Sequence, residues 1–151
     1  MPIELNESKI RIFLKENSLG RLGYTDGTTV YIVPMNYRLE SNSIILYSLE
    51  GKKTNLMRNH PSVCFEVDRI TDSNNWESVV ITGFFEEIIE ENELTQLRPL
   101  YTEYMLRKRA SLASDPTLEK QEPATAKQEA KQVFFRIIFD QVTGRSQSGF
   151  M

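Results

Sequence analysis

Residues 44–61, IILYSLEGKKTNLMRNHP, contain a strand signal, a flexible connection and a helix signal in direct succession. Ile44–Tyr47 is apolar and β-favouring. Ser48–Gly51 forms a connection, and a helix-like segment opens at Lys52. Pro61 ends that segment, because the residue before a proline is pushed out of helical geometry. The stretch therefore predicts a strand that leads through a short loop into a short helix.

Two lysines, Lys52 and Lys53, stand at the start of this predicted helix, and Leu56 and Met57 give it an apolar side. A helix start presents unpaired N–H groups and a partial positive charge, both of which suit an anion. From the residues alone, this start is either a phosphate site or a solvated helix end with surface lysines.

The composition is that of an ordinary globular protein. The 151 residues predict one domain, 1–151, with 40% hydrophobic and 26% charged residues. The formal net charge of −3 argues against a general nucleic-acid binder. No apolar run reaches the roughly 18 residues that span a bilayer, and no signal peptide is visible, so we expect no membrane partner and a cytoplasmic location.

The single cysteine, Cys64, excludes an internal disulfide and fits a reducing compartment. We expect it to be a small buried hydrophobe. One cysteine and one histidine, His60, cannot make a conventional zinc site, so no metal is expected. His60 is interpreted as a turn residue.

The segment before residue 44 reads as one helix and two strands. Asn6 or Ser8 can cap a short helix, and Gly20–Tyr24 is strand-like. Asp26-Gly27 predicts a two-residue hairpin. Thr28–Leu39 is β-rich but contains Pro34, which predicts an edge strand or a bulge because proline cannot donate to a sheet ladder.

Two strands follow residue 61. Val63–Asp68 alternates apolar and polar residues, and Trp76–Ile89 reads as a long strand with a bulge or close approach at Gly83. Trp76 is interpreted as a packing or dimer-interface residue, with stacking on a ligand as the alternative.

The C-terminal part predicts a helix and a last strand. Asn92 is expected to cap the helix, which Pro99 kinks or divides. Residues 110–132 are interpreted as a mobile connection, and Val133–Phe139 as the final strand. Antiparallel hairpins dominate, so the fold class is mainly β, a small β-barrel with α-helices packed on its outside.

An ordered set of short motifs resembles one family. The set consists of Gly20-Arg21-Leu22-Gly23, Tyr31-Ile32-Val33-Pro34-Met35-Asn36-Tyr37, Leu46-Tyr47-Ser48, Gly51-Lys52-Lys53, Asn59-His60-Pro61-Ser62-Val63-Cys64-Phe65, Trp76-Glu77-Ser78-Val79-Val80 and Gly83, with weaker support from Thr143-Gly144-Arg145. It looks like the pyridoxamine 5′-phosphate oxidase-like superfamily of FMN-binding split barrels, nearest the branch of nitroimidazole-resistance proteins.

The resemblance implies a six-stranded antiparallel split barrel that forms a homodimer, with one FMN in each of two clefts between the subunits. It further implies a set of cofactor-binding residues: Val33, Pro34, Met35 and Asn36 along the flavin ring, Tyr47 and Ser48 near the ribityl chain and phosphate, Lys52 and Lys53 on the phosphate, Ser78 as a polar flavin contact, and Arg145 near the cofactor. The alternatives stay open: Pro34 in an ordinary edge strand, Ser78 as an outward-facing strand serine, and Arg145 as a solvated tail residue.

Two departures from the family pattern limit the function. Some nitroimidazole-resistance relatives carry a histidine where this chain has Leu46 and Tyr47. The tail 144–151 lacks the Trp- and Arg-containing pattern with which true pyridoxamine phosphate oxidases hold substrate, so oxidation of vitamin B6 is not expected.

The sequence thus leads to one hypothesis and one alternative. The hypothesis is an FMN-dependent oxidoreductase for a small-molecule substrate, with NAD(P)H as donor and a nitroaromatic or quinone as acceptor; no catalytic residue can be named. The alternative is a non-catalytic flavin- or haem-binding module on the same barrel.

Overall fold

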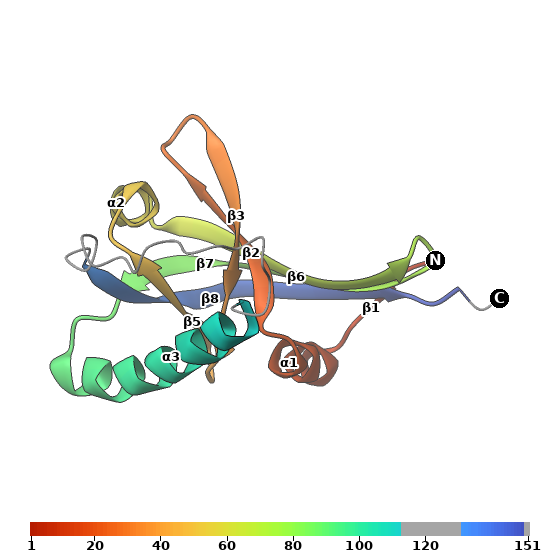
Figure 1. The fold of residues 1–151 in the computed structure, drawn as a ribbon. Helices are drawn as coiled ribbons and strands as arrows, with labels where there is room; N and C mark the ends of the chain where they lie inside the picture. Colours follow the sequence, from red (N-terminus) through yellow and green to blue (C-terminus); the bar gives the residue numbers. More distant parts are fainter. Residues whose placement is uncertain (113–130, 150–151) are drawn as a thin grey trace.

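The chain is built on one antiparallel sheet, seen in a computed structural model that describes residues 1–112 and 131–149, with the backbone alone for 102–112. The sheet order is β3-β2-β6-β7-β8-β5-β4, and β1 pairs with β8 (Figure 1). The elements are β1 (Ile3–Glu4), α1 (Glu7–Glu16), β2 (Leu19–Thr25), β3 (Val30–Asn36), β4 (Arg38–Leu39), β5 (Ser43–Leu49), α2 (Lys52–Asn59), β6 (Ser62–Asp72), β7 (Asn75–Glu87), α3 (Glu91–Leu112) and β8 (Gln132–Gln147).

The mainly β fold with flanking helices is confirmed, but the strand count and the closure differ from the prediction. The described sheet has eight strands rather than six, and its ends β3 and β4 do not pair, so the barrel is open. Two features of the chain account for the strands beyond the predicted six. The predicted strand 28–39 is divided at Tyr37, because β3, which pairs with β2, ends at Asn36, and β4 pairs with β5 instead. The N-terminal Ile3–Glu4 adds a short strand along β8.

The core lies inside the curved sheet and follows the alternation of the strands. Phe65, Val67, Val79 and Ile81 are fully buried. The same alternation turns Cys64 outward, and it is exposed. The expectation of a buried cysteine is therefore wrong, because its neighbours Val63 and Phe65 already occupy the inner face.

Helix α1 covers one opening of the sheet with Phe13 and Leu14, both buried. The predicted cap is confirmed at Asn6, whose side chain accepts a hydrogen bond from the N–H of Lys9 at 2.9 Å.

We expect Asn6→Ala to lower the free energy of unfolding by about 1 kcal/mol, because the N–H group of Lys9 loses its acceptor. Denaturant unfolding measures this loss. The control is Ser8→Ala within α1, which should leave the midpoint unchanged; equal losses in both variants would contradict the assignment.

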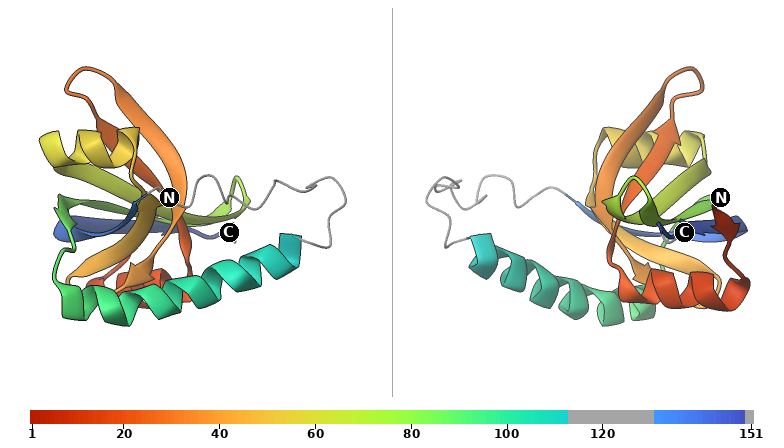
Figure 2. Two further views of the ribbon diagram at one scale, coloured as in Figure 1. Left: turned by 60° about the vertical axis from the view of Figure 1, so that its left-hand side comes forward. Right: turned by 90° about the vertical axis from the view of Figure 1, so that its right-hand side faces the viewer.

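The β2–β3 hairpin has a four-residue loop and not the predicted two-residue turn. Thr25 pairs with Val30, and the carboxylate of Asp26 accepts from the N–H groups of Thr28 and Thr29. These side-chain hydrogen bonds satisfy backbone N–H groups of the longer loop. A dipeptide pattern does not reveal them. In both views of Figure 2 the hairpin projects near α2, on the side of the sheet opposite α3.

The long strand and its bulge are confirmed. The β7–β8 register shifts between Thr82 and Gly83. A Cβ atom on Gly83 would lie 2.1 Å from the carbonyl oxygen of Ile138, so a side chain cannot be accommodated there without moving the backbone.

The C-terminal elements are longer than predicted. Glu90, not Asn92, caps α3, since its carboxylate accepts from the N–H groups of Asn92 and Glu93. Pro99 lies inside one continuous helix. Strand β8 extends to Gln147 and includes Thr143–Arg145, which were predicted to begin the tail.

Most of the predicted connection 110–132 lies outside the described residues, and its first residues end α3. No helix among the described residues is long and apolar enough to cross a membrane.

Candidate functional site

The start of α2 offers unpaired backbone donors. The first helical hydrogen bond runs from the N–H of Asn55 to the carbonyl oxygen of Gly51, at 3.1 Å. Within the described residues, no acceptor is found for the preceding N–H groups of Lys52 and Lys53, and Gly51 has no side chain to cap them. Such a helix start is suited to an anion.

The two lysines at this start differ in their surroundings. The Nζ of Lys52 lies 3.9 Å from the ring centroid of Tyr31, on the hairpin, in a cation–π contact. Lys53 is half-buried, and burial lowers the pKa of its ammonium group. No carboxylate of the described residues pairs with Lys53. Lys53 is thus the better placed of the two to receive an anionic ligand.

Strand β3 is an edge of the sheet, as Pro34 predicts. Tyr37, just after β3, donates its N–H to Ser18. In an antiparallel pair the bonded residues alternate, so Val33 and Met35 also face β2. The polar backbone groups of Pro34 and Asn36 therefore point to the unpaired edge, where they are available to a planar polar ligand.

A pocket of about 320 Å³ lies between α3 and the outer side of β4 and β5. It brings together two predicted residues, Asn36 and Tyr47, which are distant in sequence. Its wall is largely aromatic: the Tyr47 ring stacks on Tyr101 with centroids 3.6 Å apart and meets Phe134 edge-on at 5.1 Å. Such a wall suits a flat apolar ligand.

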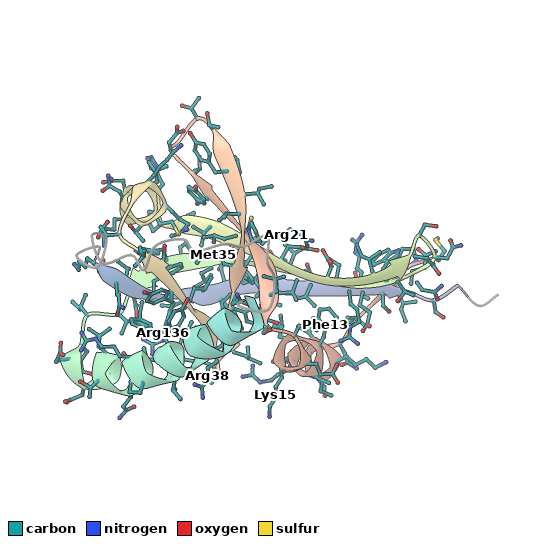
Figure 3. All side chains as sticks on the ribbon, in the orientation of Figure 1. Phe13, Lys15, Arg21, Met35, Arg38 and Arg136 are labelled. Carbon is teal, nitrogen blue, oxygen red and sulfur yellow. The ribbon has the colours of Figure 1, made fainter. Side chains whose placement is uncertain are left out.

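Ser48 is buried and is not among the residues that line this pocket, and its hydroxyl donates to the carbonyl oxygen of Leu49 at 3.0 Å. Arg136 holds α3 over the sheet (Figure 3). Its guanidinium donates to Glu40, with Nε–Oε1 at 2.7 Å, and to Glu93 on α3.

Ser78 and Arg145 lie in a different place from the other predicted residues. They pair across β7 and β8 and line a second pocket of about 260 Å³ together with the half-buried Trp76. Ser78 is separated from Pro34 by three strand spacings, about 14 Å along the sheet. Within one chain, Ser78 and Arg145 therefore form one group, and the residues at the edge of β3 form another.

A charged cluster that sequence reasoning missed lies between these two groups. The guanidinium of Arg21 donates to the carboxylates of Glu66, at 3.0 Å, and of Asp68. The hydroxyl of Ser78 also donates to Glu66, at 3.1 Å. Burial and the neighbouring Asp68 raise the pKa of the Glu66 carboxyl. The alternation of β6 indicates that Glu66 and Asp68 face outward together, but not that Arg21 lies opposite them.

Among the described residues, no group of His, Cys, Asp and Glu side chains is arranged to hold a metal ion. Three features that the predicted residues help to form are the helix start with Lys53, the free edge of β3 and the aromatic pocket.

Known proteins resemble the chain over nearly its whole length. A FAD-binding protein from Mesorhizobium loti, known from its crystal structure, is 29% identical, with a TM-score of 0.68 over 98% of each chain. A candidate 5-nitroimidazole antibiotic resistance protein from Bacteroides thetaiotaomicron is 19% identical and shares the fold, with a TM-score of 0.62 over 97% of this chain and 87% of that one. An uncharacterized protein of Rhizobium meliloti (strain 1021) is 27% identical over 128 residues, which are 85% of this chain and 83% of that protein.

The family model described as pyridoxamine 5′-phosphate oxidase matches residues 6–146, almost the whole chain. The open antiparallel sheet with its lysine-led α2 thus agrees with the resemblance noted in the sequence, and the chain belongs to the pyridoxamine 5′-phosphate oxidase family.

Proposed function

We propose that the protein binds FMN, with the phosphate at the start of α2 and the flavin ring along the free edge of β3. The observation that carries this proposal is the helix start itself: unpaired N–H groups next to the half-buried ammonium of Lys53. A phosphate ester would accept hydrogen bonds from both and would supply the counter-charge that Lys53 lacks among the described residues. The flavin binding of the Mesorhizobium loti protein supports the same class of cofactor.

The edge of β3 fits the polar side of a flavin ring. The backbone groups of Pro34 and Asn36 alternate with those that bond to β2, so they remain free to pair with ring nitrogens and carbonyl groups. Bound FMN would supply hydride or electron transfer, and the chain would position the ring and exclude water.

We assign an oxidoreductase activity in which the aromatic pocket beside Asn36 and Tyr47 takes the electron acceptor, a nitroaromatic compound or a quinone. The pocket adjoins the end of the proposed flavin strand, and its walls from Phe134 and Leu97 are apolar. A flat acceptor would therefore lie next to the ring without needing a charged partner.

Leu97→Trp is expected to raise the KM for such an acceptor by about tenfold, because the larger side chain fills part of the pocket. FMN affinity should change little, since neither Pro34 nor the start of α2 lines this pocket. The control is Ile89→Trp, at a position that is 78% exposed and lines no described pocket. Equal kinetics in both variants would contradict the assigned acceptor site.

We further propose that two copies of the chain form the complete site. The outer face of the sheet exposes apolar side chains, among them Ile32 at 72% and Phe84 at 45%. The group around Ser78 and Arg145 also lies on this face, apart from the edge of β3. Pairing of two outer faces would bury these side chains and bring the two groups together from different subunits. Light scattering should give the mass of two chains; the mass of one chain would contradict this.

The cofactor proposal is tested by purifying the protein without added flavin and titrating it with FMN, FAD and haem. We expect a yellow preparation, or FMN uptake with one equivalent per chain. Failure to bind FMN overturns the proposal; tight binding of FAD alone or a Soret-type spectrum would replace FMN with that cofactor. FMN binding without NAD(P)H consumption would favour the non-catalytic alternative.

A further inference from the structure

The loop before α2 places a carboxylate beside the proposed phosphate site. Glu50 directly precedes Gly51, the residue at which the helix starts. Acidic side chains are favoured near a helix start, because they accept from its unpaired N–H groups and complement its dipole. Glu50 is therefore a potential competitor for any anion that the helix start is to bind.

The structure shows Glu50 bonded elsewhere. Its two carboxylate oxygens accept from the Nη1 and Nη2 atoms of Arg58, at 2.7 and 2.8 Å. One of them also accepts from the hydroxyl of Thr54, at 2.8 Å. Thr54 and Arg58 are four residues apart and therefore lie on one side of α2, and their hydrogen bonds hold the Glu50 carboxylate on that side.

Arg58 has a second attachment, to the sheet. Its Nε donates to the carboxylate of Glu87, near the end of β7, at 2.8 Å. The planar guanidinium thus clamps Glu50 with one edge and Glu87 with the other. This arrangement fixes both the direction of the Glu50 side chain and the position of α2 on the sheet.

The Glu50 carboxylate keeps its charge at neutral pH. The hydrogen bonds from Arg58 and Thr54 lower the pKa of the Glu50 carboxyl to about 2. The carboxylate is therefore ionised at neutral pH, and its repulsion of a nearby phosphate has to be balanced by a cation.

We propose that Arg58 is a positioning residue for the phosphate subsite: it holds Glu50 against the side of α2 and neutralises it, so that the helix start and Lys53 remain available to a flavin phosphate. The inference rests on the proposed FMN binding and adds a residue that does not itself touch the ligand. It predicts that replacing Arg58 weakens binding of the phosphate group and leaves binding of the flavin ring unchanged.

The test compares FMN with riboflavin, which has the same ring and no phosphate, by fluorescence titration of the folded protein. In Arg58→Gln we expect FMN affinity to fall by about tenfold or more, because the released carboxylate repels the phosphate and competes for the N–H groups. Riboflavin affinity should stay within about twofold. The double variant Glu50→Gln/Arg58→Gln should recover most of the FMN affinity. The control is Arg69→Gln, which removes an arginine from the exposed pairs with Glu16 and Glu77.

If Arg58 had a purely structural role, Arg58→Gln would weaken the binding of FMN and of riboflavin alike. Adding Glu50→Gln would then not restore FMN affinity. Glu50→Gln alone keeps the inference testable if Arg58→Gln does not fold: it should tighten FMN binding several-fold and leave riboflavin unchanged. Unchanged or weaker FMN binding in Glu50→Gln would overturn the inference. If the native protein binds FMN and Arg58→Gln binds it equally well, this inference fails while the proposed function stands. If the native protein binds no flavin, the proposed function itself fails.

Discussion

Lys53→Ala is expected to weaken FMN binding by about 1.5–3 kcal/mol, roughly a factor of ten to one hundred and fifty, since a charge-assisted hydrogen bond to the phosphate is lost. The effect should be large because Lys53 is half-buried, so water replaces the ammonium group poorly. Riboflavin affinity should change little. Isothermal titration calorimetry with both ligands measures the difference.

Lys52→Ala is the matched comparison, because it removes the same charge one residue earlier. The ammonium of Lys52 already contacts the ring of Tyr31, so we expect a smaller loss than for Lys53. Lys15→Ala, in the last turn of α1, controls for net charge. Similar losses in all three variants would show that the protein's overall charge, and not a site at α2, attracts the phosphate.

Gly83→Val is expected to destabilise the fold by more than about 3 kcal/mol, enough to prevent folding of a marginally stable domain. The added Cβ atom would lie 2.1 Å from the carbonyl oxygen of Ile138 and 3.0 Å from a side-chain carbon of Ile137. The carbonyl belongs to the backbone of β8, so the two central strands would have to separate. Denaturant unfolding, or the loss of expressed soluble protein, measures the effect.

Gly51→Ala is the control for this substitution. Gly51 has extended backbone geometry, with φ of 177°, and an added methyl group would have the carbonyl oxygen of Leu49 as its nearest neighbour, at 4.0 Å. We therefore expect its stability to change by less than about 0.5 kcal/mol. A Gly83 variant as stable as Gly51→Ala would contradict the close approach of β7 and β8.

Local signals in the sequence were sufficient to predict the helix and the strands on which the site is built. The helix from Lys52 to Asn59, its end at His60 and the edge position of the Pro34 strand follow from proline chemistry and side-chain pattern, which act over a few residues. The bulge at Gly83 follows from its missing side chain. The lengths of β6 and β8 could not be predicted from local sequence, because the extension of a strand depends on partner strands that are distant in sequence.

The site was predictable in its parts and not in its arrangement. Asn36 and Tyr47 meet in one pocket because β3 leads into β4 and β4 pairs with β5. Ser78 lies three strands away, since β2 and β6 stand between. The ion pair between Arg58 and Glu50 could not be predicted from the sequence, because each side chain alone has the pattern of an ordinary surface charge. A sequence motif shows which residues are present, but sheet order decides which of them meet.

The most direct measurement is a crystal structure of the protein grown with FMN. We predict a phosphate within hydrogen-bond distance of the Nζ of Lys53 and of the first N–H groups of α2, with the ring along the edge of β3 at Pro34 and Asn36. A flavin phosphate bound elsewhere, with the start of α2 facing bulk water, would contradict this prediction.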